Sequence, residues 1–256
     1  VINSIIADGQ DNNMLVRTYA TVMNSDKCGA ENAQTNMKVE KGTKGMFLIQ
    51  DFIPNTVMFR KPFKEQVVSP SNFFIFMVQL TWILNYLHVE RGLEFLHNDL
   101  WGNNVLVESY GEVKEFDLKI RGYEFRFRRQ WGIRLIDLDH ASYRLESDDP
   151  LRLTSHAGKK LEFSDTYDLA YMLGDMMDLI NNKKEYRKKG PNTFDLTKTV
   201  EEYVAGLKAT YVLNSNGKRE PKDPGRLDEF VKFLHDQKND HLVVPDSTTV
   251  RNCDEE

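Results

Sequence analysis

The chain has 256 residues, of which 40% are hydrophobic and 29% charged, a balance typical of one sizeable globular domain or two small lobes. The formal net charge of -5 argues against a generally basic surface for nucleic acid, and no apolar run of membrane-spanning length or signal peptide is evident. The two cysteines, Cys28 and Cys253, form no metal-type cluster. We therefore expect an intracellular protein, cytoplasmic or nuclear, with no membrane partner and no sequence support for binding nucleic acid or chromatin.

The first predicted elements are two strands and a long helix. Apolar runs at residues 14–22 and 46–50 indicate strands, and the glycine-bearing stretch at 41–45 indicates the turn between them. Residues 71–87 are apolar on most helical faces, which is typical of a helix buried in the core. The chain thus begins with a little β structure and continues into a helical body.

A short polar loop follows this helix and carries the most informative spacing in the chain. His97 precedes Asp99 by two residues, and Asn104 follows Asp99 by five. A phosphoryl-transfer loop needs a carboxylate that accepts the proton of an attacking hydroxyl, and an amide oxygen that binds a metal ion on the nucleotide phosphates. We assign these roles to Asp99 and Asn104, and a structural role within the loop to His97.

Two further strands and a second acidic group follow the loop. Residues 116–120 and 123–128 alternate apolar and charged side chains around Gly122, which predicts a β-hairpin with one apolar and one charged face. We interpret Arg121, Arg126, Arg128 and Arg129 as a solvated face, with binding of an acidic substrate as the alternative. A strand at 133–136 then delivers Asp137, a second candidate magnesium ligand. Asp139 is either a further ligand or a solvated neighbour.

Helices dominate the remaining chain. Ser164 is a candidate N-cap for a helix whose apolar stripe runs to residue 180, and further amphipathic helices are predicted at 200–211 and 227–234. The basic run at 181–190 is interpreted as a solvated loop or helix end, with a nucleic-acid or substrate patch as the alternative. Residues 246–256 are predicted to form a flexible tail.

Taken together, the loop around Asp99 and the strand that ends at Asp137 resemble the catalytic lobe of the eukaryotic protein-kinase superfamily. Within the superfamily the sequence resembles divergent members, and it is most similar to haspin and to kinase-like proteins of large DNA viruses. The resemblance covers about residues 46–180. The resemblance implies an α+β fold with a partial small lobe and hinge at 1–53 and a mostly helical large lobe at 54–245, the hairpin at 116–128 being an insertion. It also implies ATP and Mg²⁺ as cofactors and a protein substrate. Its nucleotide-binding residues would be Gln50, Asp51, Ile53 and Leu106, with Asn104 and Asp137 on the metal. The alternative for residues 50–55 is an ordinary exit from a strand into a loop, ended by Pro54.

In that family an Asp near the start of the helix after the catalytic loop holds the loop through backbone amides. Asp165 fits one register and Asp168 fits the haspin-like one. Neither is a catalytic candidate. Asn98 stands where members controlled by activation-loop phosphorylation carry Arg, so that mode of phosphate pairing is excluded here.

Two kinase features have no counterpart in the sequence. A Gly-rich loop over the phosphates and a strand carrying a phosphate-binding Lys are both missing before residue 46. Since the first residue is Val1, we interpret the chain as a fragment or a degenerate member and expect it to be weakly active or inactive by itself. The segment from Asp137 to Asp165 is short and lacks Ala-Pro-Glu, which leaves the substrate open.

Three functions remain. The first is an ATP- and magnesium-dependent Ser/Thr protein kinase of divergent type. The second is a small-molecule phosphotransferase of the aminoglycoside or choline kinase type, which shares the His-x-Asp loop. The third is a pseudokinase interaction module, supported only by the missing Lys. The long hairpin and the Asp165-x-x-Asp168 helix start favour the first.

Overall fold

A computed structural model describes residues 18–23, 46–50, 53–89, 93–145, 163–182, 186 and 192–242. The chain divides into two compact units, Val1–Pro54 and Asn55–Glu256, each of which is described by itself. In the first unit, β1 (Thr18–Met23) pairs antiparallel with β2 (Met46–Gln50). Both strands lie where the apolar runs predicted them. The assignment of this unit as part of a kinase small lobe stays a prediction.

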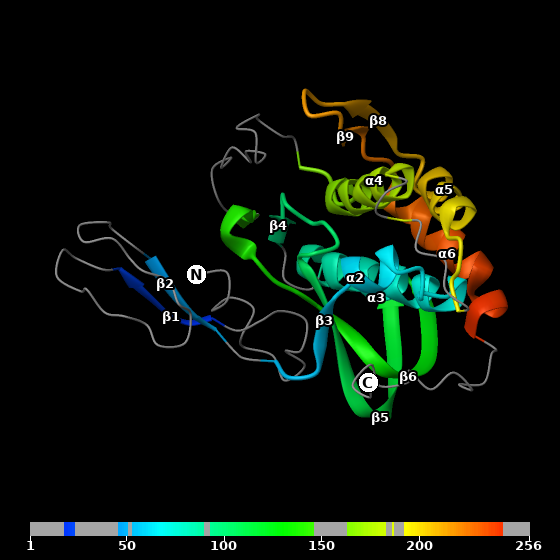
Figure 1. Ribbon diagram of the computed structural model, residues 1–256, viewed down its shortest axis with the longest axis horizontal. Helices are drawn as coiled ribbons and strands as arrows, with labels where there is room; N and C mark the ends of the chain where they lie inside the picture. The colour runs from blue at the N-terminus through cyan, green and yellow to red at the C-terminus, as the bar shows by residue number, and fades with distance from the viewer. Residues whose placement is uncertain are drawn as a thin grey trace. The chain divides into compact units, whose positions relative to one another are not determined.

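The second unit is built around α3 (Pro70–Val89), which is buried on almost every face. It packs against α6 (Leu227–Leu242), while α5 (Thr197–Leu207) packs between α6 and α4 (Tyr167–Asn181). Figure 1 shows α4, α5 and α6 gathered on one side of α3, with β5 and β6 on the other. A short helix, α2 (Arg60–Lys64), leads into α3. The all-round apolarity of residues 71–87 therefore predicted the core helix correctly.

The same helix corrects one expectation from composition. By length and apolar content α3 could cross a membrane, whereas we expected no such run from the sequence. The stretch concerned is 72% buried inside the protein, as in the core helix of a folded domain. It is therefore weak evidence for a membrane span.

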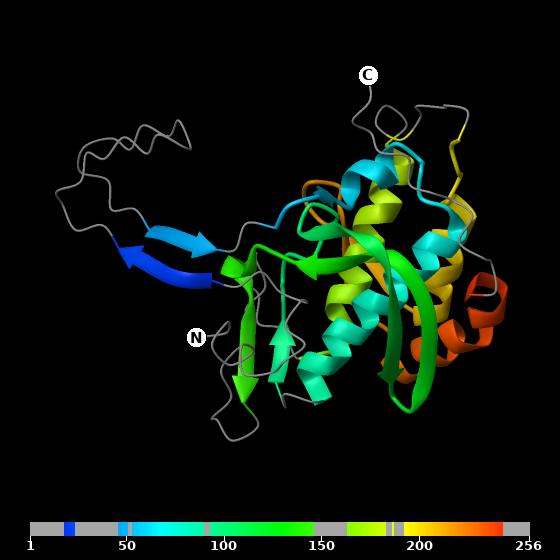
Figure 2. The same cartoon turned by 90° about the horizontal axis from the view of Figure 1, so that it is seen from below.

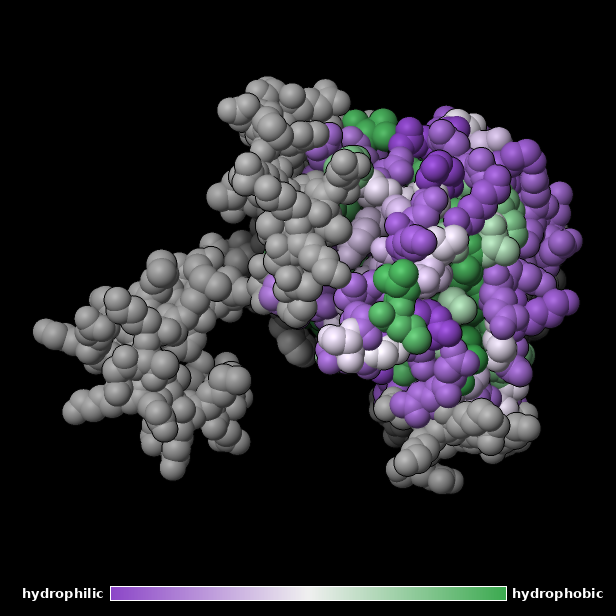
Figure 3. All heavy atoms as spheres, turned by 90° about the horizontal axis from the view of Figure 1, so that it is seen from above, coloured by the Kyte–Doolittle hydropathy of each residue, from purple (hydrophilic) through white to green (hydrophobic). Residues whose placement is uncertain are grey.

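On the face drawn in Figure 3, hydrophilic residues cover most of the described surface and hydrophobic ones form small separate groups.

The predicted hairpin is present and longer than expected. β5 (Val105–Ile120) and β6 (Tyr123–Leu135) pair antiparallel, and β3 (Thr56–Met58) adds to β5 as a third strand. The turn at Arg121 and Gly122 has φ of 49° and 83°, the left-handed pair that a two-residue hairpin turn needs. One face packs on α3 and α6 through four buried side chains: Leu118, Ile120, Phe125 and Phe127. Figure 2 shows the hairpin beside α3 and α6.

The opposite face of the hairpin is charged and balanced within itself. Arg126 lies opposite Asp117 and pairs with it at 3.3 Å, and Arg128 lies 3.9 Å from Glu115 on the neighbouring strand. Arg129 was wrongly assigned to this face, because it has the same parity as Phe127 and is therefore turned inward, where it is 7% exposed. The exposed arginines are thus already matched by carboxylates.

Two small sheets complete the described fold. β4 (Leu93–Leu96) pairs with β7 (Ser142–Leu145), and β8 (Thr210–Leu213) pairs with β9 (Arg219–Asp223). The prediction that Tyr211 continues a helix was wrong, because α5 ends at Leu207 and Lys208 is left-handed with φ 59°. The β8–β9 hairpin was missed although Asn216-Gly217 between its strands is a turn signal.

The described residues thus form an α+β structure with five helices and small antiparallel sheets, as predicted at the level of fold class. The kinase fold itself stays a prediction. The tail at 246–256 and most of the basic run at 181–190 lie outside the described residues.

Candidate active site

The loop that carries Asp99 lies between β4 and β5 and is hydrogen-bonded to the first turn of α4. The Asp168 carboxylate accepts hydrogen bonds from the backbone N–H of His97 at 2.7 Å and of Asn98 at 3.1 Å. Burial raises the pKa of Asp168, while His97 and the two N–H donors oppose that shift. Asp168 is therefore the loop anchor. The other candidate, Asp165, pairs with Arg121 of the hairpin turn at 2.8 Å.

His97 ties the loop to the strand that carries the second acidic group. Its imidazole is fully buried, and its Nε2 lies 2.9 Å from the backbone carbonyl of Ile136. Because a carbonyl only accepts, this nitrogen carries the proton and donates. The arrangement agrees with the structural role expected for His97.

The two residues assigned to chemistry are in direct contact. The Asn104 side-chain amide donates to the backbone carbonyl of Asp99 at 2.8 Å and to its carboxylate at 3.0 Å. Asn104 is 5% exposed, so its orientation is fixed by packing as well as by these bonds. Within the part of the chain that the structure describes, the Asn104 side-chain oxygen accepts no hydrogen bond. This oxygen is therefore free to bind a metal ion.

Asp137 is brought to the same place by the backbone. The Ile136 N–H donates to the Asn104 carbonyl at 3.1 Å, so the next residue begins beside the loop. Asp137 has φ 63° and ψ 60°, a left-handed conformation that non-glycine residues rarely adopt, and it is exposed. Such outliers cluster at functional sites. The structure thus brings the loop of Asp99 and Asn104 together with the strand end at Asp137, although these segments are far apart in sequence.

Asn98 has a structural task that its sequence position did not reveal. Its backbone is left-handed with φ 63°, a conformation that Asn tolerates better than most residues. Its side-chain amide donates to the His140 carbonyl at 2.9 Å and to the Ser142 hydroxyl at 2.8 Å. Asn98 therefore ties the loop to the 3₁₀ turn Leu138–His140 and to β7.

Sequence reasoning missed a second carboxylate of α4 that reaches the loop. Asp175 accepts from the Gly102 N–H at 3.2 Å and from the Arg60 guanidinium at 3.0 Å. Asp168 and Asp175 are seven residues apart, which puts them on one face of a helix. This spacing was the available signal, but Asp175 stands among the apolar residues of α4 and was not singled out.

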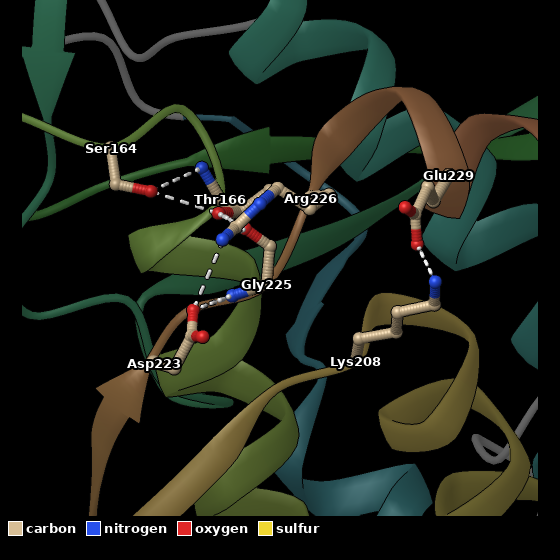
Figure 4. Close-up of polar contacts among 7 residues, drawn as sticks. All are labelled: Ser164, Thr166, Lys208, Asp223, Gly225, Arg226 and Glu229. Carbon is tan, nitrogen blue, oxygen red and sulfur yellow. Dashed lines mark hydrogen bonds and ion pairs between the residues drawn. The ribbon is translucent and has the colours of Figure 1, made fainter.

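The start of α4 is fixed to the connection before α6, as Figure 4 shows. The helix begins at Tyr167, so Ser164 is not its N-cap as predicted; the Ser164 hydroxyl instead lies 2.9 Å from that of Thr166. The Thr166 hydroxyl donates to the Gly225 carbonyl at 3.4 Å. Gly225 has φ +89° and lies against the Leu207 backbone, where a side chain would collide. These contacts fix the register that aims Asp168 at the loop.

The proposed nucleotide-binding residues are divided between the two units, and the described structure does not test whether they form one site. Gln50 ends β2, but nothing is described of its side chain, and Asp51 lies outside the described residues. Ile53 is half-buried in the first unit, and Leu106 is half-buried on β5 of the second. The side chain of Asp139 also lies outside the described residues. The roles of these residues stay predictions.

The donor set fits a magnesium ion shared with phosphates better than a metal held by protein alone. Among the described residues no group of three or more His, Cys, Asp or Glu side chains could hold a metal ion. One amide oxygen at Asn104 and one carboxylate at Asp137 are hard oxygen ligands, and Mg²⁺ commonly takes one or two protein ligands with phosphate oxygens and water. The residues present therefore fit Mg²⁺ bound together with a nucleotide.

Comparison with known proteins identifies no relative from which a function could be assigned. The sequence matches no protein-family model and no curated protein. We therefore infer the function from the geometry of the loop.

Proposed function

We propose that the protein transfers the terminal phosphoryl group of ATP, with Mg²⁺, to the hydroxyl of a Ser or Thr in a protein substrate. The observation that carries the proposal is the pairing of the Asn104 amide with the Asp99 carboxylate at 3.0 Å, beside the strand end at Asp137. A base and two metal ligands within one small region are the parts that phosphoryl transfer needs.

Each residue would have a distinct task. Asp99 orients the acceptor hydroxyl and accepts its proton as the oxygen attacks. The side-chain oxygen of Asn104 and the carboxylate of Asp137 would hold Mg²⁺, which supplies charge neutralisation on the phosphates when bound. The bond from Asn104 to Asp99 fixes the base relative to the metal ligand, so the two need not reorganise during the reaction.

Asp168, His97 and Asn98 support this arrangement without taking part in the chemistry. Asp168 holds two backbone N–H groups at the start of the loop, and His97 connects the loop to the strand before Asp137. The position of the loop relative to the strand before Asp137 is therefore set by buried and partly buried hydrogen bonds. Such rigid support is what positioning requires.

The test is a transfer assay with radiolabelled ATP, Mg²⁺ and peptides that carry Ser, Thr or Tyr, beside choline and an aminoglycoside as small acceptors. We expect slow, magnesium-dependent labelling of Ser and Thr peptides that Asp99→Asn abolishes. Asp165→Asn is the matched control, because Asp165 is a carboxylate near α4 whose partner is Arg121.

Two outcomes would overturn the proposal. Labelling of the small acceptors alone would favour the small-molecule phosphotransferase. Absence of both labelling and magnesium-dependent ATP binding would favour a non-catalytic interaction module.

A further inference from the structure

We propose that Asp175 and Arg60 form a second anchor of the catalytic loop and act as positioning residues for Asp99. The catalytic part of this inference rests on the proposed function. The structural part, that this pair fixes the far end of the loop, stands on its own contacts.

The two carboxylates of α4 hold the loop at opposite ends. Asp168 accepts the N–H groups of residues 97 and 98, and Asp175 accepts that of Gly102 at 3.2 Å. Asp99 lies between these two points. Because both carboxylates project from one face of one helix, their spacing is set by the rigid geometry of α4. The loop that carries the proposed base is therefore held at both ends by a single element.

Arg60, the first residue of α2, completes the second anchor. Its guanidinium donates to the Asp175 carboxylate at 3.0 Å, and its backbone N–H donates to the Gly102 carbonyl at 2.9 Å. The guanidinium also lies over the Trp101 ring, 5.0 Å from the centroid. Arg60 thus contacts two consecutive loop residues and the carboxylate that holds one of them.

The close approach of the loop to Arg60 explains why residue 102 is a glycine. A Cβ atom added to Gly102 would lie 3.0 Å from the Arg60 Cβ and 3.1 Å from its Cα, closer than most packed atoms. A larger residue would separate the loop from α2. Gly102 therefore lets the backbone approach both Arg60 and Asp175.

The charges of the pair make the anchor sensitive to single substitutions. The side chains of Arg60 and Asp175 are 21% and 15% exposed. Burial raises the pKa of Asp175, and the neighbouring Arg60 opposes the shift. Removing one partner would leave the other charge partly buried without its counter-ion, which is more damaging than losing a surface pair. The anchor should therefore act as a unit.

Asp178 supplies a matched control on the same helix. It is about as buried as Asp175 and also pairs with an arginine, but that partner is Arg219 of β9, and its carboxylate accepts the Arg219 N–H at 2.8 Å. Asp175→Ala and Asp178→Ala therefore each remove an arginine partner and a backbone acceptor from α4. Only the first removes contacts to the loop.

The structural test is NMR on the full chain. In Asp175→Ala we expect amide hydrogen exchange at Gly102 to quicken by roughly tenfold or more, and the side-chain amide signals of Asn104 to shift. Asp178→Ala should leave both signals unchanged. Asp175→Asn keeps an oxygen acceptor for Gly102 and should lie between wild type and Asp175→Ala, which also covers the case in which the alanine variant fails to fold. Equal effects of Asp175→Ala and Asp178→Ala on Gly102 would overturn the anchor.

The catalytic test is the rate of phosphoryl transfer. Asp175→Ala should lower kcat roughly 10- to 100-fold with the KM for ATP nearly unchanged, because misplacing a base by about 1 Å has effects of this size. A rise in the KM for ATP without a loss of kcat in Asp175→Ala would overturn the positioning role. An equal loss of kcat in Asp178→Ala would also overturn it. If wild type neither transfers phosphate nor binds ATP in a magnesium-dependent way, the proposed function fails, whereas exchange at Gly102 still decides whether the anchor exists.

Discussion

The loop around Asp99 and the outer face of the β5–β6 hairpin are two polar regions of the described structure, and they are built in opposite ways. The hairpin face pairs arginines and carboxylates that are largely exposed, as in Arg126 and Asp117, whose side chains are 69% and 56% exposed. The loop instead depends on buried groups that accept backbone N–H bonds, with Asp168 only 3% exposed. Surface pairs contribute little to stability, whereas a buried carboxylate that satisfies two amides is hard to replace. A high density of charged residues in a sequence therefore does not locate a candidate site. Buried polar groups that bind the backbone are the better indicator.

The largest effect is expected at the loop anchor. Asp168→Ala should lower the free energy of unfolding by about 3 kcal/mol or more, because two buried N–H groups lose their acceptor. Asp165→Ala, which removes an exposed partner of Arg121, should change it by less than about 1 kcal/mol. Urea unfolding of both variants measures the difference. A similar, small loss in both would show that Asp168 is not the principal anchor.

A second, smaller effect is expected at Asn98. Asn98→Ala should destabilise the protein by about 2 kcal/mol, since it removes two side-chain bonds and puts alanine in a left-handed conformation. Asn98→Gly removes the same bonds without the backbone penalty and should cost about 1 kcal/mol less. Thermal unfolding of both separates the two causes. Equal losses would mean that the backbone conformation contributes nothing.

A third effect reports on the negative field of the loop. Burial, and after it Asp99, raises the pKa of Tyr171 from its ordinary 10.0 to about 12. The folded state thus holds this proton more tightly than the unfolded state, so the stability that it contributes is present below pH 10 and is lost as the pH rises towards 12. Asp99→Asn should lower the pKa of Tyr171, as measured by ultraviolet titration against Tyr171→Phe. An unchanged titration would place Tyr171 outside the influence of Asp99.

The smallest effect is expected on the hairpin face. A double-mutant cycle with Asp117→Ala and Arg126→Ala should give a coupling free energy of less than about 0.5 kcal/mol, because the pair is exposed and screened. Transfer to peptides should be unaffected by either change. A coupling above about 1 kcal/mol, or loss of transfer to acidic peptides, would mean that this face has a role beyond solvation.

Local patterns predicted the described elements that obey a simple period. The buried helix α3 and the β5–β6 hairpin followed from apolar runs and alternation, and the same alternation, extended by two residues past Phe127, would have placed Arg129 inside. The end of α5 could not be read in this way, because Lys208 adopts the left-handed conformation that is usually marked by glycine. There the apolar spacing continued to Tyr211 although the helix did not.

The sequence identified the residues that meet at the candidate site better than the residues that support them. The spacing of Asp99 and Asn104 identified two side chains that the structure brings into contact. The choice between Asp165 and Asp168 depended on where α4 begins, a boundary that residue preferences locate only within a few residues. The task of Arg60 depends on the path of α2, which no local pattern near the loop contains.

The most direct test of the central claim, that Asp99 is a base and Asp137 a metal ligand, is calorimetric titration with ATP in the presence and absence of Mg²⁺. Asp137→Asn should weaken magnesium-dependent ATP binding by roughly tenfold or more, because a neutral amide is a poorer ligand for a hard dication. Asp99→Asn should leave that binding within about twofold of wild type, since the lost carboxylate acts on the acceptor hydroxyl. If Asp99→Asn abolished magnesium-dependent binding while Asp137→Asn left it unchanged, the two roles would be reversed or the kinase-like arrangement would be wrong.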